Sequence, residues 1–89
     1  DALVTAADYD PISKTLALTS YTFDGDQYLY RFSNFDINNI KESKFEKHLI
    51  PVKPAQIETI KVEDSFTFWL TSEDEGGGSP RLFKACLSY

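Results

Sequence analysis

The sequence is short of the residue types from which most catalytic and metal sites are built. Its 89 residues include one cysteine, one histidine, one tryptophan and no methionine. A single cysteine excludes an internal disulfide, and with one histidine a zinc site would have to rely on carboxylates. Because methionine is absent, we expect the chain to be a processed or excised piece of a longer protein.

Long apolar runs and basic clusters are missing as well. No stretch approaches the roughly 20 apolar residues of a membrane-spanning helix. The net charge is −5, from 14 acidic and 9 basic residues, which disfavours binding to a nucleic-acid backbone. Without a basic amphipathic helix, an anionic membrane surface is also disfavoured. We therefore expect neither nucleic acid nor a membrane as a partner.

Aromatic residues, in contrast, are plentiful at 15% of the chain. Such side chains suit the pleated, half-buried surface of a strand. The alternation of apolar and polar residues predicts strands over residues 3–10, 14–22, 27–33, 45–52, 55–62, 66–72 and 81–87. Residues 34–44 are rich in Asn and Asp, which predicts a loop with at most a short helical turn. Cys86 lies in the last apolar alternation and is expected to be buried.

One six-residue pattern occurs twice. Thr15–Ser20 reads TLALTS and Thr67–Ser72 reads TFWLTS. The two series align without a gap from 4–20 onto 56–72, and after one residue of slack 28–31 aligns with 81–84. Two matches in the same order, each in a strand context, indicate an internal repeat.

A repeat of four antiparallel strands with a period near 50 is typical of a β-propeller blade. We therefore predict an all-β unit, residues 1–89, with a first blade-like repeat at 3–52 and a partial second repeat at 55–89. A blade cannot cover both of its faces alone, so we expect further propeller blades as partners, from the same longer chain or from identical copies. A small β-sandwich is the structural alternative.

Several of these strands carry a resemblance to a known family. The segments VTAADYDP, KTLALTSY and QYLYRF, followed by AQIETI, FWLTSED and RLFK, look like blades of secreted bacterial β-propeller proteins. They are also loosely similar to esterase-like and phytase-like propellers. The resemblance implies an extracellular, periplasmic or cell-surface location, and it transfers no chemistry by itself.

Four side chains are candidates for ligand binding. Asp8 and Glu58 lie on the innermost predicted strand of each repeat, which in a propeller approaches the central channel. Trp69 and Tyr30 offer aromatic surfaces on which a sugar ring could stack. The alternatives are a turn-capping or solvated role for the two carboxylates and packing between blades for Trp69.

Acidic loop residues are the candidates for a metal site. Asp24 and Asp26 lie in the predicted first hairpin turn, and Glu73 and Asp74 open the corresponding loop of the second repeat. Flexible, oxygen-rich loops can bind Ca²⁺, although the spacing matches no EF-hand. The alternative is a pair of solvated turns, with no cofactor at all.

The absence of a nucleophile–base pair favours a non-catalytic scaffold, or a ligand- or protein-binding segment, of a secreted β-propeller. Two other functions stay open. One is a Ca²⁺-dependent phytase- or esterase-like hydrolase. The other is a lectin-like module that forms a ring by oligomerisation.

Overall fold

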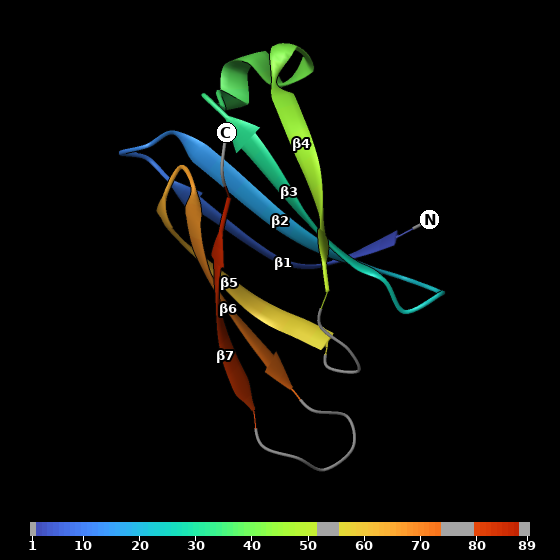
Figure 1. Ribbon diagram of the computed structural model, residues 1–89. Coiled ribbons are helices and arrows are strands. Elements are labelled where there is room, and N and C mark those ends of the chain that lie inside the picture. Colours follow the sequence, from blue (N-terminus) through green and yellow to red (C-terminus); the bar gives the residue numbers. More distant parts are fainter. Residues whose placement is uncertain (1, 52–55, 74–79, 88–89) are drawn as a thin grey trace.

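Two antiparallel β-sheets make up the chain (Figure 1), as described by a computed structural model for residues 2–51, 56–73 and 80–87. The first sheet contains, in the order β1-β2-β3-β4, the strands β1 (Ala2–Asp10), β2 (Thr15–Thr22), β3 (Gln27–Ser33) and β4 (Lys44–Ile50). The second contains, in the order β5-β6-β7, the strands β5 (Gln56–Asp64), β6 (Thr67–Glu73) and β7 (Arg81–Cys86). The all-β prediction is confirmed.

A short 3₁₀ helix, η1 (Ile37–Glu42), connects β3 to β4. The Asp36 side chain caps it by accepting a hydrogen bond of 2.9 Å from the Asn38 amide. Asn39 has a non-helical backbone conformation and divides the element into two short 3₁₀ turns, where the sequence predicted a loop with at most one. Asx side chains compete with a regular helix and favour caps. Within the described residues, no helix has the length and apolarity needed to cross a membrane.

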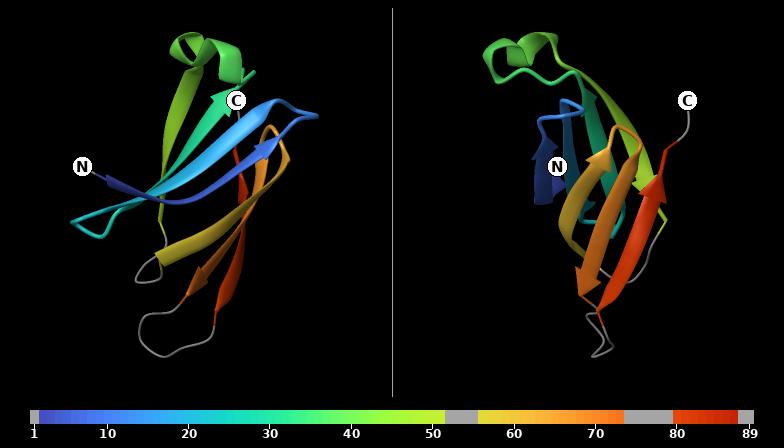
Figure 2. Two further views of the ribbon diagram at one scale, coloured as in Figure 1. Left: turned by 180° about the vertical axis from the view of Figure 1, so that it is seen from behind. Right: turned by 90° about the vertical axis from the view of Figure 1, so that its left-hand side faces the viewer.

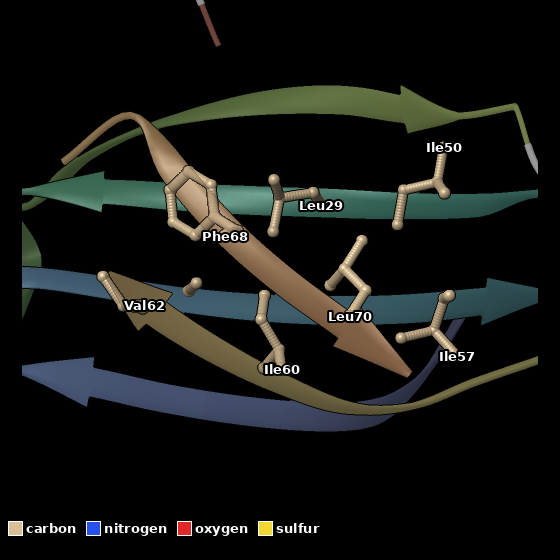
Figure 3. Close-up of a cluster of buried hydrophobic side chains, with 8 residues drawn as sticks. Leu29, Ile50, Ile57, Ile60, Val62, Phe68 and Leu70 are labelled. Atoms are coloured by element: carbon tan, nitrogen blue, oxygen red, sulfur yellow. The ribbon is translucent and has the colours of Figure 1, made fainter. Parts of the chain in front are cut away.

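The hydrophobic core lies between the two sheets. The second sheet lies across the first, with β5 beside β1 and β2 (Figure 2). Side chains from both sheets meet in the space between them (Figure 3). The buried set contains Ala17, Leu29 and Ile50 from the first sheet and Ile57, Ile60, Val62, Phe68 and Leu70 from the second.

Two polar side chains of the first sheet also bind the backbone of β5. The Asp8 carboxylate accepts a hydrogen bond of 2.8 Å from the Val62 amide. The buried Gln27 side chain accepts one of 2.6 Å from the Ile57 amide. Because an unpaired buried amide is costly, these two contacts fix the position of β5 along the first sheet.

Arg31 joins the sheets near the β5–β6 turn. Its Nη1 donates a 2.9 Å hydrogen bond to the Ser65 carbonyl, and its guanidinium lies 4.7 Å from the centre of the Phe66 ring. On β4, Glu46 forms an ion pair with the same guanidinium. A charge that is nearly buried is therefore both paired and hydrogen-bonded, as burial requires.

Strand pairing corrects the gapless alignment of the two repeats. Ala7 pairs with Leu18 in the first sheet, and Ile60 pairs with Leu70 in the second. Ala7 is therefore equivalent to Ile60, a separation of 60 − 7 = 53 positions, whereas the alignment assumed 52. The cause is local, because the β1–β2 turn spans 11–14, the β5–β6 turn spans 65–66, and β5 has an additional register shift after Val62.

The expectation that Cys86 is buried is wrong, because Cys86 is exposed. Along β7 exposed and half-buried residues alternate, and Cys86 shares the exposed positions with Leu82 and Lys84. These positions lie on the side of the second sheet that faces away from the core. Apolar alternation located the strand correctly but did not show which side of it is covered.

Candidate functional site

The outer side of the first sheet carries an apolar and aromatic surface. We call it the aromatic face. Cross-strand pairing places Tyr9, Leu16, Phe32 and Phe45 in one row of this face, since directly paired residues point to the same side of a sheet. With its neighbouring rows and Phe35 of the following loop, the aromatic face comprises Val4, Tyr9, Leu16, Leu18, Tyr28, Tyr30, Phe32, Phe35, Phe45, Lys47 and Leu49.

The rings of this face form a connected series, which Phe35 of the following loop joins. Ring centres of Tyr9 and Phe35 are 6.0 Å apart, as are those of Phe35 and Phe32. Phe45 then lies 5.3 Å from Phe32 and 5.8 Å from Tyr30. Edge-on and tilted pairs at such distances are attractive, so the rings hold each other in place.

Lys47 adds a positive charge at one side of the series. Its ammonium lies 4.2 Å from the centre of the Tyr28 ring and 5.9 Å from that of Tyr30. Contacts of this kind at exposed sites contribute about 0.5–1 kcal/mol. The surface is thus aromatic with one cation, which is unlike the solvated side of an ordinary antiparallel sheet.

The aromatic face is open to solvent. Val4 is 63% exposed, and Phe45 and Leu49 are each 57% exposed. Part of the face is hollowed by a depression of about 290 Å³, lined by Val4, Leu18, Ser20, Tyr30, Phe32 and Phe45. Because large exposed apolar surfaces often mark interaction sites, the aromatic face is the candidate functional site of this chain.

The outer side of the second sheet is different. We call it the tryptophan face, and it comprises Lys61, Trp69, Thr71, Leu82, Lys84 and Cys86. The Trp69 indole donates a 3.3 Å hydrogen bond to the Glu63 carboxylate, and the Lys84 ammonium lies 5.2 Å from the centre of its ring. This face combines two cations and the Thr71 hydroxyl with one large ring.

Equivalent residues have opposite exposure in the two sheets. Val4 is 63% exposed on the aromatic face, whereas its equivalent Ile57 is fully buried between the sheets. In the other direction, Leu29 is 2% exposed in the core, whereas its equivalent Leu82 is 64% exposed on the tryptophan face. The same reversal separates Leu18, half-buried on the aromatic face, from Leu70 at 1% exposure.

This reversal defines how the sheets are stacked. The side of the second sheet that enters the core is equivalent to the aromatic face of the first. The side of the first sheet that enters the core is equivalent to the tryptophan face of the second. The two sheets therefore stack in the same sense, one after the other, whereas a two-fold arrangement would bring equivalent sides together. In oligomers such contacts are called heterologous, and they leave one unmatched side at each end.

The two candidate carboxylates of the innermost strands have separate positions. Asp8 faces the second sheet, where it holds the Val62 amide and lies 4.0 Å from the Lys61 ammonium. Glu58 is exposed at a register shift of β5, beside a hollow of about 420 Å³ that also includes Val4. A hydrogen bond with Glu73 and the repulsion of its charge raise the pKa of Glu58.

The two aromatic candidates lie on different surfaces. Tyr30 belongs to the aromatic face and Trp69 to the tryptophan face, so one chain does not bring them together around a ligand. The indole of Trp69 is already engaged by Glu63 and Lys84. What the two residues share is a central position on an uncovered side of a sheet.

The acidic candidates for a metal site lie in or next to turns. Asp24 and Asp26 belong to the β2–β3 turn, where Gly25 has a φ of +86° and the Asp26 carbonyl accepts a 2.9 Å hydrogen bond from the Thr22 amide. Glu73 ends β6, and Asp74 lies outside the described residues. Among the residues that the structure describes, no three His, Cys, Asp or Glu side chains are grouped to hold a metal ion.

Two further carboxylates have a structural role at equivalent turns. Asp10 accepts a 2.7 Å hydrogen bond from the Ser13 hydroxyl, and this contact, with those of backbone amides, lowers the pKa of Asp10. Asp64 accepts a 2.9 Å hydrogen bond from the Phe66 amide, which lowers the pKa of Asp64. These residues end the first strand of each repeat and close the turn that follows.

Sequence reasoning did not select most of the aromatic face. Tyr30 was a candidate, but Tyr9, Phe35, Phe45 and Lys47 were not. The available signal was the repeat itself, because apolar positions of β1 and β2 match positions that the second sheet buries. Comparisons with protein-family models, with curated proteins and with solved structures find no match for this chain.

Proposed function

We propose that this chain is a non-catalytic scaffold or binding segment of a secreted β-propeller, in which its two sheets act as successive blades. The observation that carries the proposal is the same-sense stacking of two equivalent sheets. Heterologous stacking continues until a ring closes or a filament forms, and propellers are rings of such four-stranded units. The proposal includes an extracellular, periplasmic or cell-surface location, which depends on the resemblance of the strands to secreted propellers.

Burial supports this role for the aromatic face. Its residues Val4 and Leu18 are equivalent to Ile57 and Leu70, which are buried by the neighbouring sheet. The same apolar pattern is covered by a neighbouring sheet in the second repeat and is exposed in the first. The simplest physical reason for keeping it apolar is that a further sheet covers it in the complete assembly, since large exposed apolar surfaces mark interaction sites.

Tandem fusion tests the blade proposal. One, two and three copies of residues 1–89, joined by Gly/Ser-rich linkers, would be compared by thermal unfolding and by binding of a dye that fluoresces on apolar surfaces. Because each added copy covers one more aromatic face, the midpoint temperature should rise with copy number and dye binding per copy should fall. An unchanged midpoint with constant dye binding per copy would contradict the proposal.

Assays for hydrolysis test the non-catalytic part. Phosphate monoesters and carboxylic esters would be offered with and without Ca²⁺, using wild type and the Glu73→Gln variant. We expect no turnover above the buffer rate in either case. Turnover that depends on Ca²⁺ and is lost in the variant would favour the hydrolase instead.

A further inference from the structure

The two uncovered faces of this chain are equivalent, position by position, to the two faces that pack against each other in the core. Inside the chain, the side of the first sheet that carries Leu29 packs on the side of the second sheet that carries Ile57. The equivalents of these two residues are Leu82 on the tryptophan face and Val4 on the aromatic face. Both equivalents are highly exposed, at 64% and 63%.

We propose that the aromatic face binds the tryptophan face of a second copy of this chain, head to tail, in the geometry of the internal contact. This inference rests on the proposed blade arrangement and adds to it the partner and the contacting residues. The same contact can repeat from copy to copy, because each copy retains one free face of each kind. Copies joined in this way form a ring or an open stack.

Side-chain size supports the match. In the internal contact the small residue is Ala17 of the first sheet, and the buried large residue is Phe68 of the second. In the proposed contact Trp69 takes the place of Ala17, and Leu16 takes the place of Phe68. The larger side chain therefore lies on the tryptophan face, whereas in the internal contact it lies on the side of the second sheet that is equivalent to the aromatic face. The hollow of about 290 Å³ on the aromatic face, which Leu18 helps to line, offers space for the Trp69 ring of the second copy.

Charge supports the match as well. Lys84 is equivalent to Arg31, whose guanidinium lies 4.7 Å from the centre of the Phe66 ring in the internal contact. A cation is therefore retained at this position of the tryptophan face, and the partner surface is rich in rings. Cations over aromatic rings attract each other more strongly when water is removed.

The contact between copies should nevertheless be weaker than the internal one. Asp8 and Gln27, which bind amides of β5, have Lys61 and Pro80 as their equivalents. Neither replacement has a side-chain oxygen that can accept an amide hydrogen bond. Each copy also carries a net charge of −5, so repulsion between copies opposes association and added salt should strengthen it.

A pair of matched variants tests the contact. Val4→Glu and Leu82→Glu each place one charge at a highly exposed position, so both variants should stay folded as monomers. Phe23→Glu is the control, because Phe23 is 94% exposed in the β2–β3 turn, outside both faces. Association of the unmodified 89-residue chain and of each variant would be followed by sedimentation, with circular dichroism to verify folding.

We expect wild type and Phe23→Glu to form oligomers that grow with concentration. Either face variant alone should have a dissociation constant at least ten times higher. Mixing Val4→Glu with Leu82→Glu should restore one contact and yield a one-to-one dimer, because each variant contributes the intact face that the other lacks. Should one of the two variants fail to fold, Trp69→Ala replaces Leu82→Glu, or Tyr30→Ala replaces Val4→Glu, with the same expected result.

Three results would overturn the inference. The first is a wild-type chain that is monomeric up to about 1 mM, the concentration at which even a weak contact of about −4 kcal/mol is half saturated. The second is association that only Val4→Glu abolishes, since that means two aromatic faces bind each other. The third is association that neither variant weakens. A stabilised tandem fusion combined with monomeric free copies would show that the two faces fit when linked but that separate chains do not associate, which would refute the self-association proposed here and leave the blade proposal intact.

Discussion

Leu18 and Leu70 occupy the same position of two equivalent strands, each followed by Thr and Ser, yet only Leu70 lies in the core at 1% exposure. The difference lies in what covers each strand. The side of β6 that carries Leu70 packs on the first sheet, whereas the corresponding side of β2 belongs to the uncovered aromatic face. The comparison indicates that two leucines in the same local pattern contribute differently to the free energy of unfolding, because only one of them is covered by a neighbouring sheet.

The largest effect should come from truncating this pair. Leu70→Ala should lower the free energy of unfolding by about 2–5 kcal/mol, because it removes buried atoms and leaves a cavity. Leu18→Ala should cost less, about 1–2 kcal/mol, since the Leu18 side chain is only partly buried. Chemical denaturation at a concentration where the chain is monomeric measures both values. Equal losses would mean that the two faces are covered alike.

The next effect concerns the polar contact between the sheets. Asp8→Ala leaves the Val62 amide without its acceptor and should cost about 1–3 kcal/mol. At the equivalent position Lys61 is exposed and its ammonium lies 4.0 Å from the Asp8 carboxylate, so Lys61→Ala should cost no more than about 1 kcal/mol. Denaturation curves for both variants, with Asp8→Asn retaining an acceptor oxygen, test the assignment. A neutral Asp8→Ala would show that Asp8 does not position β5.

Carboxylates should make the stability of the fold depend on pH. The direction of this dependence is opposite for Asp64 and for Glu58. The pKa of Asp64 is lowered by the Phe66 amide, so its contribution is present above its unfolded pKa and is lost as pH falls through the folded value. The pKa of Glu58 is raised by Glu73, so stability is lost as pH rises through the folded value. At pH 7, Glu58→Gln should therefore raise the midpoint temperature and Asp64→Asn should lower it.

The Glu58→Gln difference should shrink first, as pH falls through the raised pKa of Glu58, whereas the Asp64→Asn difference should shrink only below about pH 4, because the pKa of Asp64 is lowered. Midpoint temperatures between pH 3 and pH 8 check this. Thr5, at the register shift equivalent to that of Glu58, provides the comparison in the first sheet, and Thr5→Ser should leave the pH profile unchanged. Shifts of the same sign for Glu58→Gln and Asp64→Asn would be inconsistent with these pKa directions.

The smallest effect is expected at Cys86. Because the residue is exposed on the tryptophan face, Cys86→Ser should change the free energy of unfolding by no more than about 0.5 kcal/mol. For the same reason a thiol reagent should label the folded chain at the rate seen in denaturant, within a few fold. Protection from labelling at low protein concentration would place Cys86 in the core after all.

Strand positions could be predicted from the sequence because they depend on local alternation. The patterns in 14–22 and 27–33 located β2 and β3 within a residue, and Asn and Asp marked the loop that contains η1. The register of the innermost strands was wrong by one residue, because turns of different length and a shift after Val62 change the spacing without changing the pattern.

The candidate site was predicted only in part for a related reason. Tyr30 was selected for its ring, but the aromatic face is assembled from β1 to β4 and from the loop with Phe35, which only the folded sheet brings together. Asp8 was predicted as a ligand-binding candidate, and in the structure its carboxylate accepts a hydrogen bond from a backbone amide of another strand. That partner, Val62, is 54 positions away, beyond any pattern of local spacing.

By itself, then, the sequence determined the all-β class, the position of the strands and the recurrence of the TLALTS pattern as TFWLTS. These depend on side-chain alternation and turn chemistry within a few residues. Only the tertiary structure decided which side of each sheet is buried, because an alternating strand offers two sides and the choice depends on the neighbouring sheet. The same-sense stacking that leaves one aromatic and one tryptophan face uncovered is a property of that choice.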